Sequence, residues 1–466
     1  MVTRELAEWV ANLDLADIPA ETIKSGKMLL LDSLGCLIAG TLNEPAKIAA
    51  RAVKRHSGPA EMATILVTGT KCSVRDAAFI NGVTMYSVGF NGYHKPAMMH
   101  PGAAVIPALL AVGEWQESSG RDVLAALTAG YEVSARIGQA MAPGLLERGF
   151  NGNGTIGTFG ATASAGRLMG LTSDQFISAF GINGSQAAGL QEWHREAALT
   201  VVFHAGRAAQ NAVEACVLAV EGLTGPSTIL EGREGFCQAY SSGADADKII
   251  LELNRFTAFQ ETTVRPHFGA TSTIAASSGA IEVLRRLGAG AQDVSGVTVR
   301  THSTHVAAHD FAKPTTLQGA RQSLQYNVAQ AIGRGVLTRD IVEADLLDPA
   351  VQAALPLVQL ISDDNIPRFG AEISIRLKDG RSETILNTAP LGDPANPLSW
   401  DQIVKKFLRL LTGACDQLGL PFSECRARTV VDAVADLEKL RMKEFIGFLN
   451  AAVPLYGADR RNEKCG

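Results

Sequence analysis

The feature that most constrains the fold is a helical periodicity that runs through roughly the first 260 residues. Apolar side chains recur there at three- and four-residue spacing, the pattern of helices that bury one face. The helices that this pattern predicts cover residues 6–13, 23–38, 46–56, 74–86, 105–118 and 123–141. Thr172, followed by Ser173 and Asp174, has the signature of an N-cap and predicts a further helix.

Two segments in this region consist almost wholly of small residues. They are residues 157–167 (GTFGATASAGR) and 204–212 (HAGRAAQNA). Because the distance between packed helices depends on the side chains at their contact, small side chains let two backbones approach closely. We therefore expect these two helices to cross at the centre of a helical domain.

The pattern changes after about residue 263. Residues 297–302 alternate as in a strand, and residues 371–377 and 382–386 flank an Asp-Gly pair that is typical of a hairpin turn. Helices are expected near 323–332 and 338–343, after Ser399, and over 430–449. The sequence predicts a mostly α protein with an α/β part, in which a large, discontinuous helical domain carries an inserted smaller α/β lid domain.

The predicted boundaries follow from these changes in pattern. Residues 1–265 form the helical domain, residues 266–395 form the α/β lid domain, residues 396–455 form C-terminal helices that return to the helical domain, and residues 456–466 form a polar tail.

Charge and composition argue against several classes of partner. The net charge is −5, whereas a protein that binds nucleic acid needs a basic face. No apolar run approaches the roughly 20 residues of a membrane span, and Glu5 and Glu8 are unlike a secretory signal. Seven cysteines, none in a CxxC pair, fit reduced thiols. We expect a cytoplasmic protein without a nucleic-acid or membrane partner.

Two motifs suggest a cofactor but fail on their context. Gly152–Gly157 spells GxGxxG, yet neither the preceding nor the following segment is the strand that a dinucleotide site requires. A glycine-rich turn that leads into a helix suits a carboxylate, and close packing explains it equally well. His302, His305 and His309 have metal-like spacing, but they follow a strand into a loop, and exposed loop histidines are the preferred interpretation. No metal or other cofactor is expected.

The richest group of reactive side chains lies in residues 89–102. Tyr93, His94, Lys95 and His100 occur there, immediately before a proline–glycine pair that opens a helix. These residues place acid, base and cationic groups together. The alternative is that His100 only caps the helix and that His94 is solvated. We favour a functional site, because loops on a rigid scaffold usually carry the chemistry.

A series of motifs then follows the order of a known family. The motifs lie at residues 30–36, 100–114, 130–136, 149–157, 182–189, 204–209, 222–236, 323–326 and 399–400. On these motifs the chain resembles the MmgE/PrpD family of 2-methylcitrate dehydratase and cis-aconitate decarboxylase, from its first helix to about residue 412. The resemblance implies a helical domain with an inserted α/β lid, a site at their junction, and a homodimer.

At several family positions this chain carries other residues. The family's Asp-x-x-Asp-Thr run is replaced by residues 90–94, and the histidine of its GFH motif by Asn151. A family lysine falls at Val201 and a catalytic-site histidine at Ala270. Its Lys-Pro-Tyr-Pro run becomes Arg265-Pro-His-Phe. His100 and the cation of Arg265 therefore remain from the family's polar set.

The predicted site combines these retained residues with new ones. The predicted acid–base residues are His100, His94 and His267. Arg265 is predicted to bind a substrate carboxylate through its planar guanidinium. The other predicted substrate-binding residues are Asn151, Tyr93, Lys95 and His204. The segment Trp193–Glu196 is interpreted either as part of the site or as a surface turn.

These residues fit proton transfer at a carbon beside a carboxylate or carbonyl group. The predicted function is a cofactor-independent lyase, of dehydratase or decarboxylase type, that acts on a small carboxylate-bearing metabolite. Two alternatives stay open: an isomerase or epimerase on the same scaffold, and a catalytically decayed paralogue that binds a metabolite. Val201, Phe90 and Ala270 favour decay, whereas the new groups of His94, Tyr93 and His267 speak against it.

Overall fold

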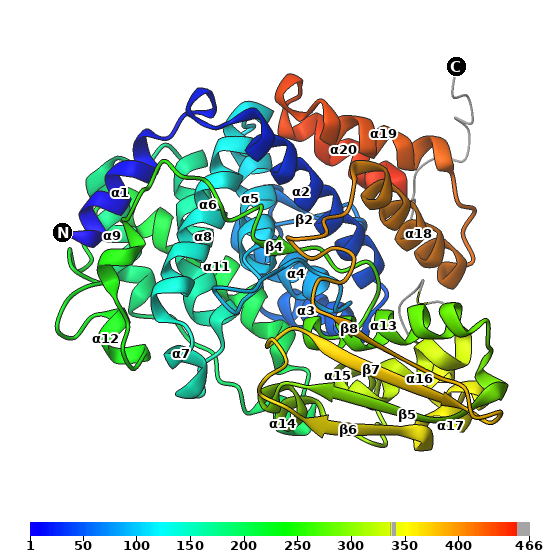
Figure 1. The fold of residues 1–466 in the computed structure, drawn as a ribbon. Coiled ribbons are helices and arrows are strands. Elements are labelled where there is room, and N and C mark those ends of the chain that lie inside the picture. Colours follow the sequence, from blue (N-terminus) through cyan, green and yellow to red (C-terminus); the bar gives the residue numbers. More distant parts are fainter. Residues whose placement is uncertain (336, 338–341, 454–466) are drawn as a thin grey trace. The chain divides into compact units, whose positions relative to one another are not determined.

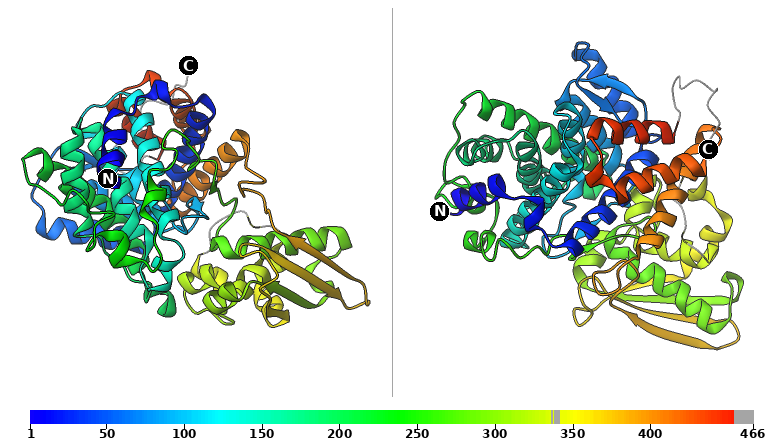
Figure 2. Two further views of the ribbon diagram at one scale, coloured as in Figure 1. Left: turned by 60° about the vertical axis from the view of Figure 1, so that its left-hand side comes forward. Right: turned by 90° about the horizontal axis from the view of Figure 1, so that it is seen from above.

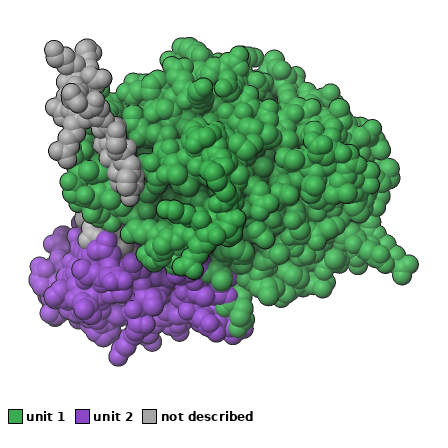
Figure 3. Space-filling model, turned by 180° about the vertical axis from the view of Figure 1, so that it is seen from behind, with its two compact units in different colours: residues 1–192, 200–263, 399–466 green, residues 193–199, 264–398 purple. Residues whose placement is uncertain are grey.

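The computed structural model describes residues 1–335, 337 and 342–453, and the chain divides into two compact units (Figure 3). Unit 1 comprises residues 1–192, 200–263 and those from Ser399 onward, and unit 2 comprises residues 193–199 and 264–398. Unit 1 is helical and unit 2 contains a small mixed sheet (Figure 1). The predicted fold class, mostly α with an α/β part, is confirmed.

Unit 1 is a helical assembly with two pairs of very short strands. Its helices are α1 (Val2–Asn12), α2 (Ala20–Gly40), α3 (Glu44–His56), α4 (Val74–Tyr86), α5 (Gly102–Trp115), α6 (Gly120–Met141), α7 (Gly144–Glu147), α8 (Gly152–Leu168), α9 (Ser173–Gly184), α11 (Thr200–Val220), α12 (Phe236–Tyr240), α18 (Trp400–Leu418), α19 (Glu424–Ala435) and α20 (Met442–Ala452). The antiparallel pairs are β1 (Ala63–Ile65) with β2 (Thr70–Cys72) and β3 (Tyr93–His94) with β4 (Thr262–Thr263). The six helices predicted within residues 6–141 are confirmed, and Thr172 caps α9 as predicted.

The centre of unit 1 is formed by helices that are buried along nearly their whole length. Every residue of α5 from Gly102 to Glu114 is buried, as is every residue of α8 from Gly152 to Gly166. Helices α4, α6 and α11 pack around them (Figure 1). The predicted packing of the two small-residue helices is confirmed: the Thr158 hydroxyl of α8 donates to the Ala208 carbonyl of α11 over 3.5 Å, and a Cβ atom on Gly154 would lie 3.2 Å from the Cβ of His204. Small side chains thus bring the start of α8 against α11.

The helix predicted over 430–449 is wrong, because two helices occupy this range. α19 ends at Ala435 and α20 begins at Met442. Between them the Gly120 N–H donates to the Leu440 carbonyl over 2.8 Å, and the Met442 N–H donates to the Ser118 carbonyl over 3.0 Å. These bonds come from the start of α6, so a tertiary contact that the local sequence does not reveal stabilises the interruption.

Two findings concern the predicted location. Within the described residues no single helix is long and apolar enough to cross a membrane. Helices α2 and α3, which are bent by 77° at the break between them, reach the length and composition of a span only when they are taken together. Five described cysteines are buried thiols, whereas Cys425 is disulfide-bonded, so the expectation of reduced thiols throughout is wrong.

Unit 2 is built on a four-stranded sheet of order β6-β5-β7-β8. Its strands are β5 (Val294–Thr301), β6 (Val358–Ser362), β7 (Ala371–Leu377) and β8 (Ser382–Asn387); β5 and β6 run parallel and the other neighbours antiparallel. Helices α13 (Thr271–Leu287) and α16 (Leu324–Arg334) pack on the sheet (Figure 2). The shorter helices are α10 (Trp193–Glu196), α14 (Ser303–His309), α15 (Leu317–Gln322) and α17 (Pro349–Ala354).

The main sequence-based expectations for this unit are confirmed. The predicted strand, the hairpin and the helix near 323–332 correspond to β5, to β7 with β8, and to α16. The helix predicted near 338–343 falls mostly outside the described residues, and the predicted polar tail 456–466 lies wholly outside them.

The interpretation of His305 and His309 as exposed loop residues is wrong. Both lie in α14 and are buried, while His302 caps that helix. The Nδ1 atom of His309 lies 2.9 Å from the Gln322 carbonyl oxygen, and its Nε2 lies 2.6 Å from the Ser272 hydroxyl oxygen. Because a carbonyl only accepts, Nδ1 carries the proton and the Ser272 hydroxyl donates to Nε2.

His194 of α10 contacts the same cluster, with its ring centroid 5.3 Å from that of His309. The segment Trp193–Glu196 is thereby part of unit 2, with its aromatic side chains half-buried. Burial, aided by the nearby His194 and His305, lowers the pKa of His309 well below its ordinary value.

The close contact between α4 and α11 predicts a cost for enlarging Gly206. A Cβ atom there would lie 2.6 Å from the Phe79 carbonyl oxygen and 2.7 Å from a methyl group of Val83. We expect Gly206→Ala to lower the free energy of unfolding by roughly 1–3 kcal/mol through overpacking. Gly413→Ala in α18 is the matched control, since no atom of the described residues lies within 4 Å of the added methyl group, and it should raise the stability by about 0.5–1 kcal/mol. Urea unfolding measures both; equal effects would contradict this packing.

The histidine cluster predicts that unit 2 loses stability in mild acid. The pKa of His309 is depressed in the folded state, so only the unfolded chain takes up this proton as the pH falls below about 6.5. The stabilisation is complete above that pH and declines by about 1.4 kcal/mol per pH unit below it. We therefore expect the free energy of unfolding in urea to differ less between pH 7.5 and pH 5.5 for His309→Gln than for the wild type. His56→Gln, at an exposed position, is the control; identical pH dependence in all three proteins would refute the prediction.

Candidate active site

Several polar side chains of unit 1 lie at the N-terminus of α8. Asn151 caps this helix, and its Oδ1 accepts the N–H groups of Asn153 and Gly154 over 3.0 and 3.4 Å. Asn153 in turn accepts the backbone N–H of His100 on its Oδ1 over 2.8 Å. The loop that carries His100 is therefore attached directly to the first turn of α8.

The His100 ring has a defined orientation. Its Nδ1 lies 2.8 Å from the carbonyl oxygen of Gly92. A carbonyl only accepts, so Nδ1 carries the hydrogen and Nε2 is the atom that gains and loses a proton. The rings of Tyr86 and Tyr93 meet the His100 ring edge to face, at centroid distances of 5.1 and 4.8 Å. Asn153 donates to the Tyr86 hydroxyl over 2.8 Å, so one amide orients both the histidine backbone and a ring that packs on it.

His204 of α11 borders the same helix start. A Cβ atom on Gly189 would lie 3.3 Å from the Cβ of Asn151 and 3.5 Å from the Cδ2 of His204, so this glycine separates the two side chains. His204 is 8 % exposed, and among the described residues its buried Nδ1 has no hydrogen-bond partner. Burial lowers the pKa of His204, so the ring is neutral near pH 7. A buried polar atom without a partner, at the positive end of a helix, is suited to a ligand group.

His94 lies on the other side of the loop and is fully buried. Its Nδ1 accepts the N–H of Ala97 over 3.1 Å, and its Nε2 lies 3.2 Å from the Glu261 carboxylate. The hydrogen bond from His94 lowers the pKa of Glu261. With both ring nitrogens engaged inside the protein, His94 fastens the loop to the segment before β4. Its predicted catalytic role stays a prediction that this arrangement does not favour.

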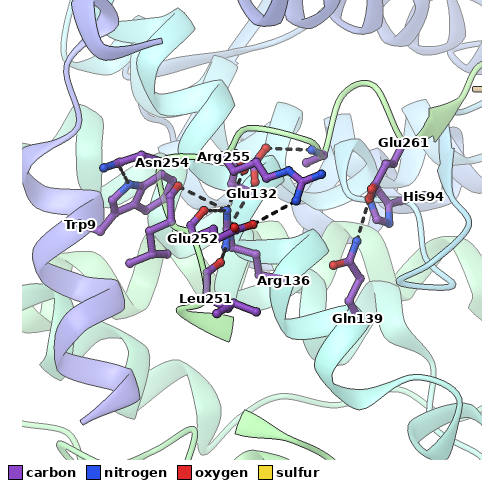
Figure 4. Close-up of polar contacts among 12 residues, drawn as sticks. Trp9, His94, Glu132, Arg136, Gln139, Leu251, Glu252, Asn254, Arg255 and Glu261 are labelled. Atoms are coloured by element: carbon purple, nitrogen blue, oxygen red, sulfur yellow. Dashed lines mark hydrogen bonds and ion pairs between the residues drawn. The ribbon is translucent and has the colours of Figure 1, made fainter. Parts of the chain in front are cut away.

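The segment 251–261 is itself anchored on α6 (Figure 4). Arg136 donates to the carbonyls of Leu251 and Arg255 over 2.7 and 2.8 Å, and Glu132 accepts the Ala258 N–H over 2.8 Å. Burial raises the pKa of Glu132 to about 7. Because β4 follows this segment and pairs with β3, α6 helps to position Tyr93.

Arg265 and His267 belong to unit 2. Arg265 is 3 % exposed and donates to the Gly269 carbonyl over 2.7 Å, which fixes the direction of its guanidinium. The Nδ1 of His267 lies 3.0 Å from the Phe268 carbonyl oxygen, so Nδ1 carries the hydrogen here as well. Lys95 lies in a turn of unit 1, where its carbonyl accepts the Met98 N–H, and its side chain is partly exposed.

The structure thus brings four predicted residues together at the start of α8. They are Tyr93, His100, Asn151 and His204. Sequence reasoning missed Asn153 and Tyr86. The signal for Asn153 was an amide side chain between two glycines at the start of a helix. The sequence indicated Tyr86 only as the last residue of a predicted helix. Among the described residues no group of three or more histidine, cysteine, aspartate or glutamate side chains could hold a metal ion.

Comparison with known proteins agrees with this architecture. The MmgE/PrpD N-terminal domain matches residues 4–249, and the MmgE/PrpD C-terminal domain matches residues 270–419. A cis-aconitate decarboxylase-like protein of Aspergillus oryzae is 28% identical, over 89% of this chain and 91% of its own length. Human cis-aconitate decarboxylase is 28% identical over 87% of each chain, and the 2-methylcitrate dehydratase of Cupriavidus necator is 23% identical over 82% of this chain and 85% of its own.

The two family domains together cover most of the sequence, in the order and over the range that its motifs predicted. This chain belongs to the MmgE/PrpD family.

Proposed function

We propose that the protein is a cofactor-independent lyase that acts on a small carboxylate-bearing metabolite by proton transfer. The observation that carries the proposal is the His100 ring, whose Nδ1 is engaged by the Gly92 carbonyl so that Nε2 is the acid–base atom. The relatives named above are decarboxylases and a dehydratase, which are lyases with carboxylate substrates. These relatives favour a lyase over an isomerase or epimerase.

One acid–base group serves both lyase reactions. In a decarboxylation the C–C bond to the carboxylate breaks, and the electron pair left on carbon takes a proton. In a dehydration a proton leaves carbon, and the hydroxyl on the neighbouring carbon departs with the electron pair of its C–O bond and takes up a proton to form water. Protonated His100 delivers the proton in the first case, and neutral His100 accepts it in the second.

The start of α8 is the proposed site for a substrate carboxylate. The positive end of the helix dipole favours an anion, and Asn151 and His204 border it. Tyr93 packs on His100 and would line the same site. Lys95, on the same loop, is proposed to add positive charge nearby.

A homodimer and a cytoplasmic location stay predictions. Light scattering decides the first, since the monomer has a mass of 49.1 kDa.

Replacing His100 tests the acid–base role. We expect His100→Gln to lower kcat/KM by about 10²–10⁴-fold on whichever of cis-aconitate or 2-methylcitrate the wild type converts. The glutamine amide does not occupy the position of Nδ1, so the bond to the Gly92 carbonyl is not preserved, and the melting temperature is measured beside kcat. His94→Gln is the matched control: it loses the buried contacts with Ala97 and Glu261 and should mainly lower stability. A destabilised His100→Gln protein with full kcat would show that His100 only supports the loop.

Arg265 is proposed to bind a carboxylate of the substrate through two N–H groups of its planar guanidinium. Lysine keeps the positive charge but has no second N–H in the plane, so Arg265→Lys should raise KM and change kcat much less. Steady-state kinetics with the converted substrate provides both constants. A fall in kcat at unchanged KM would contradict a binding role, and an effect on thermal stability alone would identify the bond to Gly269 as its purpose.

A further inference from the structure

A buried ion pair contacts the loop that carries His100. Asp32 of α2 and Lys406 of α18 form this pair, and their side chains are 0% and 2% exposed. Removing two charges from water costs about as much as their attraction returns, so a buried ion pair often stabilises a protein no better than apolar residues of similar volume. The contacts of this pair suggest a purpose other than stability.

The Lys406 ammonium has a second partner in the loop. Its Nζ donates to the Phe90 carbonyl oxygen over 3.2 Å and lies 5.4 Å from the centroid of the buried Phe90 ring. The residue before Phe90, Gly89, has a φ of +69°, which glycine adopts readily. The ammonium therefore binds backbone immediately after this turn.

Two residues further on is Gly92, whose carbonyl oxygen accepts the His100 Nδ1 hydrogen. Between them Asn91 donates from its side chain to the Met85 carbonyl over 3.1 Å. The contacts of β3 with β4 and of His94 with Glu261 follow Gly92 in the chain. Lys406 thus fixes the loop on the side that precedes Gly92, and those contacts fix it on the side that follows.

We infer that Asp32 and Lys406 are a positioning pair, which sets the Gly92 carbonyl and through it the tautomer of His100. The inference rests on the acid–base role proposed for His100. Asp32 orients the ammonium, the ammonium holds the Phe90 carbonyl, and the short stretch of backbone from Phe90 to Gly92 transmits the constraint. Neither side chain touches the substrate in this scheme.

The test replaces both charges at nearly constant shape, because removing Asp32 alone would leave the Lys406 ammonium buried without this counter-ion. In Asp32→Asn/Lys406→Met the Phe90 carbonyl loses its cationic donor. The matched control is Lys405→Met, the exposed neighbour on α18. Proteins labelled with ¹⁵N-histidine are compared by NMR, since the imidazole nitrogen shifts report which nitrogen carries the hydrogen. Comparison with His100→Gln identifies the His100 signals.

We expect the wild type and Lys405→Met to show His100 with the hydrogen on Nδ1. The double variant should show a mixture of tautomers, and its kcat should fall roughly 10–100-fold with little change in KM, as for a misplaced catalytic group. A folded double variant that keeps both the tautomer and kcat would overturn the inference. Asp32→Leu/Lys406→Met, with apolar residues of similar volume at both positions, covers the case in which the first double variant does not fold: unchanged tautomer and kcat there would overturn the inference as well.

The two proposals fail separately. A wild type that converts neither cis-aconitate nor 2-methylcitrate, or a His100→Gln variant with full turnover, contradicts the proposed function. The NMR comparison needs no turnover, so a redistributed His100 tautomer in the double variant would still support the positioning role.

Discussion

An irregular loop in the middle of a helical unit is the constraint on which the site depends. Most backbone groups of such a loop lie outside a helix, and burial without partners would be costly. In residues 87–100, β3 pairs with β4, and further backbone groups are satisfied by side chains of Asn153 and Lys406 and, within the loop, of His94 and His100. The same bonds that satisfy the backbone also determine how His100 lies. Stability of the loop and orientation of the acid–base group therefore have a common origin.

Close helix packing makes this arrangement possible. Gly154 and Gly189 leave room for His204 and Asn151 to approach the first turn of α8, and Gly82 and Gly206 let α4 meet α11. Larger side chains at these positions would collide with neighbouring backbone or side-chain atoms at 2.1–3.3 Å. The small residues thus serve both the core and the site, because Gly154 lies in the first turn of α8 and packs against His204.

Much of the fold could be predicted from local pattern. The helices before residue 141, the caps at Thr172 and Ser399, and the hairpin of β7 and β8 all follow from spacing and turn chemistry. The interruption at 436–441 could not be predicted, because its backbone partners lie some 320 residues earlier in the chain. The histidines of α14 were misjudged for a related reason: their spacing was visible, but burial against Ser272 and Gln322 depends on tertiary contacts.

The site shows the same division. Its loop was recognisable from residue types alone, and so were Tyr93, His100 and the helix start at Asn151. Distinguishing His100 from His94 needed the atoms that face each ring nitrogen, which are the Gly92 carbonyl in one case and the Ala97 N–H and the Glu261 carboxylate in the other. Lys406 gave no signal, because a lysine in an amphipathic helix normally indicates a solvated face.

The central claim is that this protein transfers a proton at a carbon beside a carboxylate. It is tested most directly by incubating the wild type and His100→Gln with cis-aconitate or 2-methylcitrate in deuterated water and following both acids by NMR. The account predicts conversion of at least one acid by the wild type, with solvent deuterium entering the product or the remaining substrate at that carbon, and its loss in His100→Gln. The absence of both conversion and exchange in the wild type, or equal exchange in the variant, would contradict it.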